Sequence, residues 1–320
     1  MSPRLPMLMW PGGSARLTIL FYHRVLAQPD PLRNWEFDAS AFAEHMALIA
    51  ERMSPLPLLE AVDLLRRGKL PKRACCVTFD DGYADNLTVA WPILQRYRVP
   101  ATVFVATAYL DGGRMFNDTL TEMVARCRGP LLDVEAFGLG RYALNTPLQR
   151  RQAVSGLLAL AKRMPPTERD ATIAEAVRAV GLADLPDDLM LTTAQLRELA
   201  GHGVEIGGHT HSHAILTTLD ASAAEAEVEA GRHRLESIIG RKIRAFAYPN
   251  GIPGSDYAGE HAAMVRRLGF ECAVSTARGV ATAECDSFQL PRFQPWTSSA
   301  LKLAAHLVRN AWAGGASQAV

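Results

Sequence analysis

The chain has 320 residues, with 34 lysines and arginines against 33 aspartates and glutamates. This near-zero net charge gives no overall field that would recruit nucleic acid or an anionic membrane, so we expect neither as a partner. The length suits one large α/β barrel or two ordinary domains. The five cysteines are irregularly spaced and include no C-x-x-C pair, which indicates reduced thiols rather than a zinc knuckle.

The first 23 residues make a poor signal peptide. They contain one early arginine and a short apolar stretch that is broken by Pro6 and again by Pro11. No apolar run approaches the roughly 20 residues that span a bilayer. We therefore expect a cytoplasmic protein without a transmembrane segment, and the sequence leaves its oligomeric state open.

The first hundred residues alternate between strand and helix patterns. Runs of β-branched and aromatic residues predict strands, and apolar residues at helical spacing predict helices. In chain order we expect a strand at 17–22, helices at 42–53 and 58–67, a strand at 74–79, a helix at 85–97 and a strand at 101–106. This alternation predicts parallel strands whose carboxyl ends share one edge, where catalytic residues gather.

The segment at about 112–188 interrupts the alternation and predicts a helical insertion between barrel strands. Its clearest helical patterns cover 148–163 and 168–180. After it we expect helices at 193–201, 221–239, 261–268 and 301–312, and strands at 204–207, 245–248 and 272–275. The sequence thus predicts one α/β catalytic domain at 14–300 that contains the insertion, followed by a C-terminal helix and tail at 301–320.

Three polar clusters each follow a predicted strand. The first is 78–83 (TFDDGY), in which one of the adjacent acids Asp80 and Asp81 can bind a cation while the other stays free as a base. An Asp-Gly pair is also a common turn signal. A plain polar turn is therefore the competing interpretation of this cluster alone.

The second cluster is 207–213 (GGHTHSH), with three histidines in five residues. Imidazole is the commonest ligand of zinc-like metals, and a solvated loop is the alternative interpretation. A helical segment would put His209 and His213 on one face with His211 elsewhere, whereas an extended one would put all three on one face. The third cluster, 244–251 (RAFAYPNG), is ordinary turn chemistry by itself.

Together the three clusters resemble the motifs of the polysaccharide deacetylase family, which shares the nodulation-type chitooligosaccharide deacetylase domain. The resemblance runs from about residue 17 to residue 293. It implies a distorted (β/α) barrel in which Asp81, His209 and His213 bind one divalent metal and Asp80 is the general base. It also implies an oxyanion contact from a backbone N–H near Tyr248. Zinc suits these ligands best, and Co, Ni, Fe or Mn also suit them.

Two histidines are candidates for the general acid that protonates the departing amine. His306 lies in a Leu-x-x-His spelling typical of the family, but within a predicted amphipathic helix. His23 ends the first strand in a Tyr-His pair, as in the circularly permuted poly-N-acetylglucosamine deacetylase subgroup, which this chain resembles. We prefer His23, whose structural alternative is a strand-end histidine with its hydrogen bonds satisfied.

The arginine of the family's third motif is missing here, and another arginine can replace it by pairing with Asp80, with a plain surface charge as the alternative interpretation of each candidate. Arg292, in 290–293 (LPRF), is our first candidate for this catalytic role, and Arg244 is the second. Among substrate contacts, we expect Asn117 and Asp118 at the barrel mouth. Trp296 can stack on a sugar ring or simply pack against protein.

The predicted function is hydrolysis of N-acetyl groups on an N-acetylhexosamine-containing polysaccharide or oligosaccharide, such as an exopolysaccharide. One alternative is a cytoplasmic metal-dependent amidohydrolase of a small cyclic amide or ureide. Another is a non-catalytic glycan-binding protein that retains the fold. The intact Asp80 and Asp81 pair argues against the last alternative, because a binding protein needs no free base beside a metal.

Overall fold

The structure is a computed structural model that describes residues 15–164, 166–182, 184–312 and 318–319. It separates into two compact units. Of the described residues, the first contains those up to Gln28, Glu36–Leu110 and those from Leu191 onward, and the second contains Pro29–Trp35 and those within Asp111–Met190. The expected insertion at 112–188 falls within the second unit. Parts of the expected tail, at 313–317 and 320, lie outside the described residues, as does residue 14.

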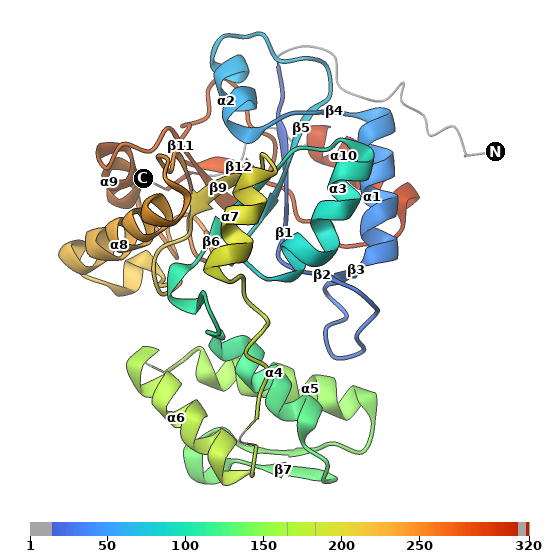
Figure 1. Cartoon of the computed structure of the whole chain (residues 1–320), viewed down its shortest axis with the longest axis vertical. Coiled ribbons are helices and arrows are strands. Elements are labelled where there is room, and N and C mark those ends of the chain that lie inside the picture. Colours follow the sequence, from blue (N-terminus) through green and yellow to red (C-terminus); the bar gives the residue numbers. More distant parts are fainter. Residues whose placement is uncertain (1–14, 165, 183, 313–317, 320) are drawn as a thin grey trace. The chain divides into compact units, whose positions relative to one another are not determined.

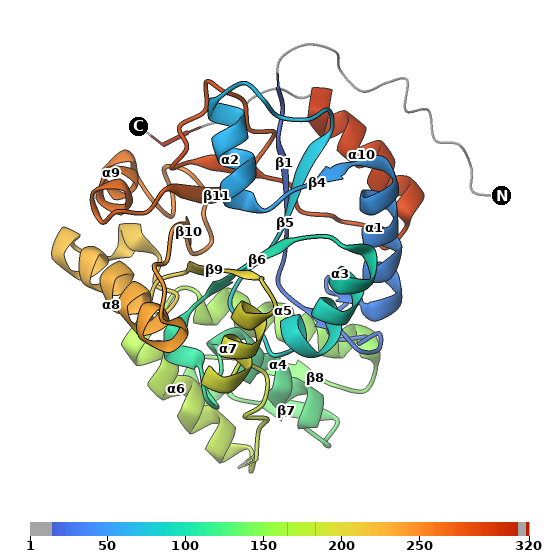
Figure 2. The same ribbon diagram turned by 45° about the horizontal axis from the view of Figure 1, so that its top comes forward.

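In the described part of the first unit, seven parallel strands form a nearly closed barrel (Figures 1 and 2). The ends of the sheet meet through the backbone of Phe293, whose N–H donates to Ile19 (2.7 Å) and whose carbonyl accepts from Phe21 (3.2 Å). The predicted distorted (β/α) barrel is therefore confirmed. Around it the strands are β1 (Thr18–Tyr22), β5 (Ala74–Phe79), β6 (Ala101–Val105), β9 (Glu205–Gly208), β10 (Ala245–Ala247), β11 (Cys272–Arg278) and β12 (Leu290–Arg292), and β4 (Ser54–Pro55) pairs with β5.

Alternate residues of the strands face two separate hydrophobic clusters. One cluster fills the barrel interior and includes Ile19, Cys76 and Ala247 together with side chains of helix α2 (Leu58–Arg66), which closes the amino-terminal end. Gly207 makes room in the barrel interior for the aromatic ring of Phe104, because a Cβ at position 207 would lie 2.3 Å from that ring. The strand edge opposite α2 is thus left for polar residues.

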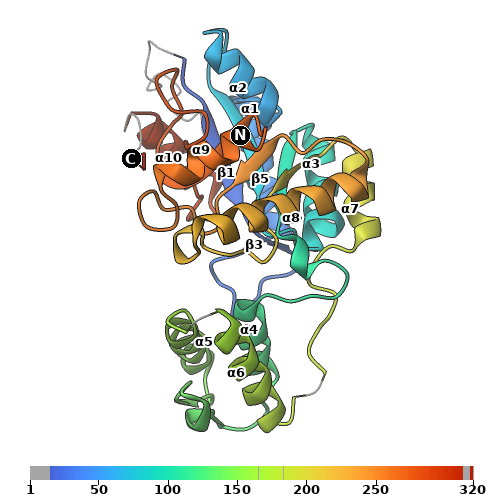
Figure 3. The same ribbon diagram turned by 90° about the vertical axis from the view of Figure 1, so that its left-hand side faces the viewer.

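The other cluster lies between the strands and the surrounding helices. Along the barrel wall, α1 contacts both α3 and α10, and α8 contacts both α7 and α9 (Figures 1 and 3). The bounds of these helices are α1 (Ala39–Arg52), α3 (Trp91–Tyr97), α7 (Thr193–Gly201), α8 (Ala221–Ile239), α9 (Gly259–Arg267) and α10 (Ala300–Trp312). None of the helices among the described residues is both long and apolar enough to cross a bilayer.

The second unit has its own hydrophobic cluster, built around residues such as Leu120 and Leu157. Arg33 joins the short segment Pro29–Trp35 to this unit through an ion pair with Glu122. The elements of this unit are α4 (Phe116–Arg126), β7 (Leu131–Asp133), β8 (Arg141–Ala143), α5 (Pro147–Ala161) and α6 (Pro166–Ala179), with a short 3-10 turn η4 (Glu135–Phe137).

Some elements differ from the sequence expectations. The expected helix at 85–97 begins as a π-helix, η2 (Asn86–Ala90), before α3. Pro92 has no N–H to complete an α-helical bond to the carbonyl four residues earlier, so a wider turn is tolerated there. Helix α4 was not predicted, because Met115 at its N-cap provides no side-chain capping bond. The sequence pattern also did not predict the short strands β2 (Val25–Leu26) and β3 (Phe37–Asp38).

Candidate active site

The two adjacent aspartates stand at the carboxyl end of β5 and are both buried. The Asp80 N–H donates to the backbone carbonyl of Tyr22 on the neighbouring strand (2.9 Å), which extends the sheet by one residue. Asp81 then takes a left-handed conformation with φ 75°, and Gly82 follows with φ 87°. This sharp turn explains how neighbouring carboxylates can meet different partners.

Arg292 of β12 forms a bidentate ion pair with Asp80. Its Nη1 and Nη2 each lie 2.7 Å from an Asp80 carboxylate oxygen, and its Nε donates to the Ser275 carbonyl at 2.8 Å. The guanidinium carbon also lies 4.4 Å from the centre of the Phe21 ring. Burial by itself raises the pKa of Asp80, but Arg292 and then His209 outweigh burial and hold this pKa below its ordinary value.

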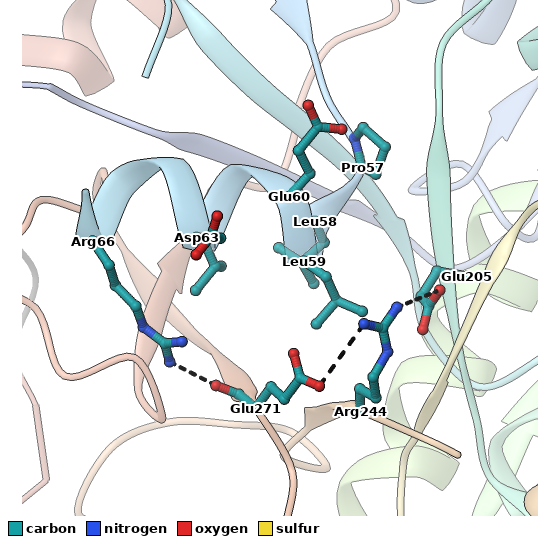
Figure 4. Close-up of a pocket in the computed structure, with 10 residues that line it drawn as sticks. Pro57, Leu58, Leu59, Glu60, Asp63, Arg66, Glu205, Arg244 and Glu271 are labelled. Atoms are coloured by element: carbon teal, nitrogen blue, oxygen red, sulfur yellow. Dashed lines mark hydrogen bonds and ion pairs between the residues drawn. The ribbon is translucent and has the colours of Figure 1, made fainter. Parts of the chain in front are cut away.

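Arg244 does not pair with Asp80, because it lies at the opposite end of the barrel. It precedes β10, and its guanidinium lies 3.8 Å from the carboxylates of Glu205 and Glu271, at the amino ends of β9 and β11. Figure 4 shows these ion pairs in a pocket beside α2. Since Asp80 stands at the carboxyl end of β5, the second candidate for its partner is wrong.

The segment 209–213, the histidine loop, brings two imidazoles to Asp81. His209 lies just beyond β9 and donates from Nδ1 to the Ala247 carbonyl (2.7 Å), which leaves Nε2 as an acceptor. The Nε2 atoms of His209 and His213 each lie 3.4 Å from Oδ1 of Asp81. One potential ligand atom from each of the three residues lies within 4.8 Å of the other two.

The histidine loop is neither helical nor extended, so neither conformation considered from the sequence is correct. Thr210 and His213 take left-handed conformations, with φ 61° and 58°, and bend the chain between regular elements. Among the described residues, His211 is not part of the group formed by Asp81, His209 and His213, and its Nδ1 lies 2.8 Å from the Thr107 hydroxyl on the 3-10 turn η3 (Thr107–Tyr109). The third histidine of the cluster therefore has a structural partner.

The residues around Asp81 fit a divalent cation. Its Oδ1 is buried and makes no hydrogen bond within the described residues, a costly state for a carboxylate oxygen. A cation between Oδ1 and the two facing Nε2 atoms would satisfy all three. The bond from His209 Nδ1 to a carbonyl is the arrangement typical of metal-ligating histidines. One carboxylate and two imidazoles also form a ligand set suited to zinc-like ions.

His23 follows β1 and is close enough to the aspartates to interact with them electrostatically. Burial lowers its pKa, but Asp81, Asp80 and Glu36 outweigh burial and raise the pKa above its ordinary value. The carbonyl of His23 accepts a hydrogen bond from Asn86 (2.9 Å), which fixes the backbone at this point.

His306 has a different environment from His23. It lies on α10, where burial lowers its pKa and the charges of Arg309, Arg278 and Lys302 lower it further. The structure thus associates His23, rather than His306, with the aspartate pair.

Tyr248 does not offer the oxyanion donor expected from the sequence. Its backbone N–H donates to Val274 (3.3 Å), as part of the ladder with β11. Its phenol is buried, donates to the Phe288 carbonyl (2.9 Å) and stacks on Tyr257. The Tyr248 side chain therefore packs between the barrel and its helices, and an oxyanion contact from another backbone N–H near Tyr248 stays a prediction.

The remaining substrate contacts stay predictions. Trp296 follows β12 and is 67% exposed, so its ring is accessible. Asn117 and Asp118 lie on α4 of the second unit, where Asp118 is buried. Sequence reasoning missed Glu36 and also Glu227 of α8, which accepts hydrogen bonds from the histidine loop. A single glutamate in a predicted helix, such as Glu227, gives no sequence signal that it will contact a loop elsewhere in the chain.

Solved structures share this fold. A deacetylase from Streptococcus pyogenes, PplD, solved in complex with acetate, aligns with a TM-score of 0.62 at 18% identity, over 92% of this chain and 99% of that one. IcaB from Ammonifex degensii aligns with a TM-score of 0.57 at 19% identity, over 92% and 98% of the two chains. At these identities the likeness concerns the fold alone.

Sequence comparisons give the family. YxkH of Bacillus subtilis, which carries the name of a polysaccharide deacetylase, is 22% identical over 87% of this chain and 71% of its own. A poly-β-1,6-N-acetyl-D-glucosamine N-deacetylase of Staphylococcus aureus is 30% identical, but over only 27% of this chain and 30% of its own. The polysaccharide deacetylase family model matches residues 67–127 and 164–273, more than half of the chain. The chain therefore belongs to the polysaccharide deacetylase family of hydrolases.

Proposed function

We propose that this deacetylase removes N-acetyl groups from N-acetylhexosamine residues of a glycan and that its activity depends on a divalent metal. The Staphylococcus aureus relative named above supports this substrate class. The observation that carries the proposal is the convergence of Asp81, His209 and His213 beside an Asp80 that Arg292 holds in a fixed orientation.

Asp81, His209 and His213 would hold the metal, with zinc the ion that these ligands suit best. When bound there, a divalent ion supplies Lewis acidity, which eases deprotonation of a water and polarises the acetyl carbonyl. A set of three protein ligands leaves positions for both of these groups.

Asp80 would act as the general base, taking a proton from the attacking water. The two hydrogen bonds from Arg292 keep its carboxylate in one orientation, and burial excludes competing solvent. The ion pair lowers the basicity of Asp80 but also keeps this carboxylate ionised and ready to accept a proton.

His23 would act as the general acid, donating a proton to the amine nitrogen as the bond from carbon to nitrogen breaks. The nearby carboxylates raise the pKa of His23, which favours the protonated form needed for this step. Acetate and a free amino sugar are the products.

The test combines metal analysis with measurement of acetate release from N-acetylglucosamine oligomers. We expect about one bound metal per chain and acetate release from the wild type. Asp80→Asn should keep the metal and lose most turnover, because it preserves the ligands while removing the base. Metal binding without acetate release from any oligomer would contradict the substrate class. Acetate release that survives complete removal of metal would contradict metal dependence.

A further inference from the structure

The histidine loop carries two proposed metal ligands on an unusual backbone. Both Thr210 and His213 have positive φ values, although neither is glycine. The left-handed region is especially unfavourable for a β-branched residue such as Thr210. Such conformations persist only where the surrounding structure holds them. The contacts of this loop therefore determine whether the two imidazoles face Asp81.

Glu227 of α8 accepts three hydrogen bonds from the middle of the histidine loop. Its Oε2 accepts from the backbone N–H groups of His211 (3.0 Å) and Ser212 (2.8 Å), and its Oε1 accepts from the Ser212 hydroxyl (2.9 Å). Successive N–H groups that converge on one carboxylate form an anion-binding concavity within the protein. Bonds to an ionised acceptor are also stronger than bonds to a neutral one.

The turn η3 holds the loop through a second set of contacts. The Ala108 N–H donates to the His211 carbonyl (2.8 Å), and the Tyr109 hydroxyl donates to the Ser212 carbonyl (3.0 Å). Helix α8 approaches the loop closely because of Gly231, where a Cβ would lie 2.6 Å from the Thr210 carbonyl oxygen. The small residue at 231 thus allows the Glu227 carboxylate to reach the loop.

We propose that Glu227 is a positioning residue that presets His209 and His213 for the metal, an inference that rests on the proposed metal site. It acts through His211 and Ser212, the residues that link Thr210 to His213. With the loop held, both Nε2 atoms already face Asp81, so little ordering remains when the metal binds. Releasing the loop should weaken metal binding without altering Asp80 or Arg292.

The experiment compares Glu227→Gln with Glu229→Gln, which makes the same charge change on the same helix. The neutral glutamine amide oxygen accepts the two backbone N–H bonds more weakly than a carboxylate does, and the amide nitrogen cannot accept the bond that the Ser212 hydroxyl donates. We expect zinc affinity, measured by competition with a chelator, to fall by about 10- to 100-fold in Glu227→Gln. The control should match the wild type. Absorption spectra of the cobalt-substituted proteins should change only in Glu227→Gln.

Turnover at saturating zinc separates positioning from a direct role in the reaction. Glu227→Gln should then regain turnover close to that of the wild type, and its apoprotein should still unfold cooperatively. Wild-type zinc affinity in Glu227→Gln would overturn the inference and leave the metal site standing. Turnover that stays low at saturating zinc would also overturn it.

Ser212→Ala keeps the test decisive if Glu227→Gln does not fold. This variant removes only the hydroxyl bond to Glu227, so we expect a smaller loss of zinc affinity. Unchanged affinity would overturn the inference. A wild-type protein that binds no zinc, cobalt or other divalent ion would instead contradict the proposed metal site, and the positioning role would fall with it.

Discussion

At the scale of single residues, the two arginines that the sequence offered to Asp80 differ in burial as well as in their position along the barrel. Arg292 is 1% exposed and forms a bidentate pair with a buried carboxylate. The Arg244 side chain is 45% exposed, and its ion pairs are 3.8 Å long. Removing one member of a buried ion pair leaves the other charge unpaired in the interior, where water cannot solvate it. Removing an exposed partner costs little, because water takes its place.

We therefore expect Arg292→Leu to lower the free energy of unfolding by about 3–5 kcal/mol at neutral pH, because Asp80 keeps a buried and unpaired charge. Arg244→Leu should lower it by about 1 kcal/mol or less. Urea denaturation of both variants beside the wild type provides the measurement. Equal losses in the two variants would show that Asp80 is not stabilised chiefly by Arg292.

The two candidate general acids can be distinguished by comparing the turnover of one variant of each. His23→Ala should lower kcat by about 10²- to 10⁴-fold at unchanged metal content, because the departing amine loses its proton donor. His306→Ala should keep wild-type turnover, since this residue lies among cations on α10. Steady-state kinetics with N-acetylglucosamine oligomers provide the measurement, and the reverse pattern would reassign the acid to His306.

At the scale of secondary-structure elements, a buried histidine joins three segments of the barrel unit. His45 of α1 is fully buried, its Nε2 donates to the Thr297 carbonyl beyond β12 (2.8 Å), and its Nδ1 accepts from the Tyr22 hydroxyl of β1 (3.2 Å). Both bonds are made by the neutral imidazole. Burial lowers the pKa of His45 to about 4, although the bond to Thr297 partly opposes this effect.

His45 should therefore make stability depend on pH. Between pH 6.5 and 4 the unfolded chain binds a proton at this histidine and the folded protein does not, so stability falls as the pH is lowered through this window. The loss from this group should be on the order of 3 kcal/mol. Denaturation across the window should show a weaker pH dependence for His45→Gln, with the exposed His233→Gln as control. Equal pH dependence in His45→Gln and the wild type would contradict the assignment.

At the scale of the whole molecule, the barrel brings together groups that are distant in sequence. Strand β12 lies beside β1 only because the sheet nearly closes, and this closure delivers Arg292 to Asp80 across 212 positions of the chain. The second unit interrupts the sequence between β6 and β9, yet these strands pair directly with each other in the sheet. The order of the strands, rather than continuity of the chain, therefore assembles the candidate site.

Much of this arrangement could be predicted, because local patterns carry it. Alternating strand and helix signals predicted parallel strands, the resemblance to the polysaccharide deacetylase family implied the barrel, and β5 occupies its expected bounds. The clusters around Asp81 and His209 were expected to meet because carboxyl ends of parallel strands share one edge. Short elements such as β2 and β3 were missed, since two residues carry no periodicity.

The sequence by itself determined the family motifs and the residue types able to bind a metal and to transfer protons, because these features are local in the chain. Only the tertiary structure decided that Arg292 rather than Arg244 meets Asp80, and that Tyr248 faces the surrounding helices. It also decided that Glu227 holds the histidine loop. These outcomes depend on sheet closure and on which face of a strand or helix is buried, and both arise from packing between segments far apart in the sequence.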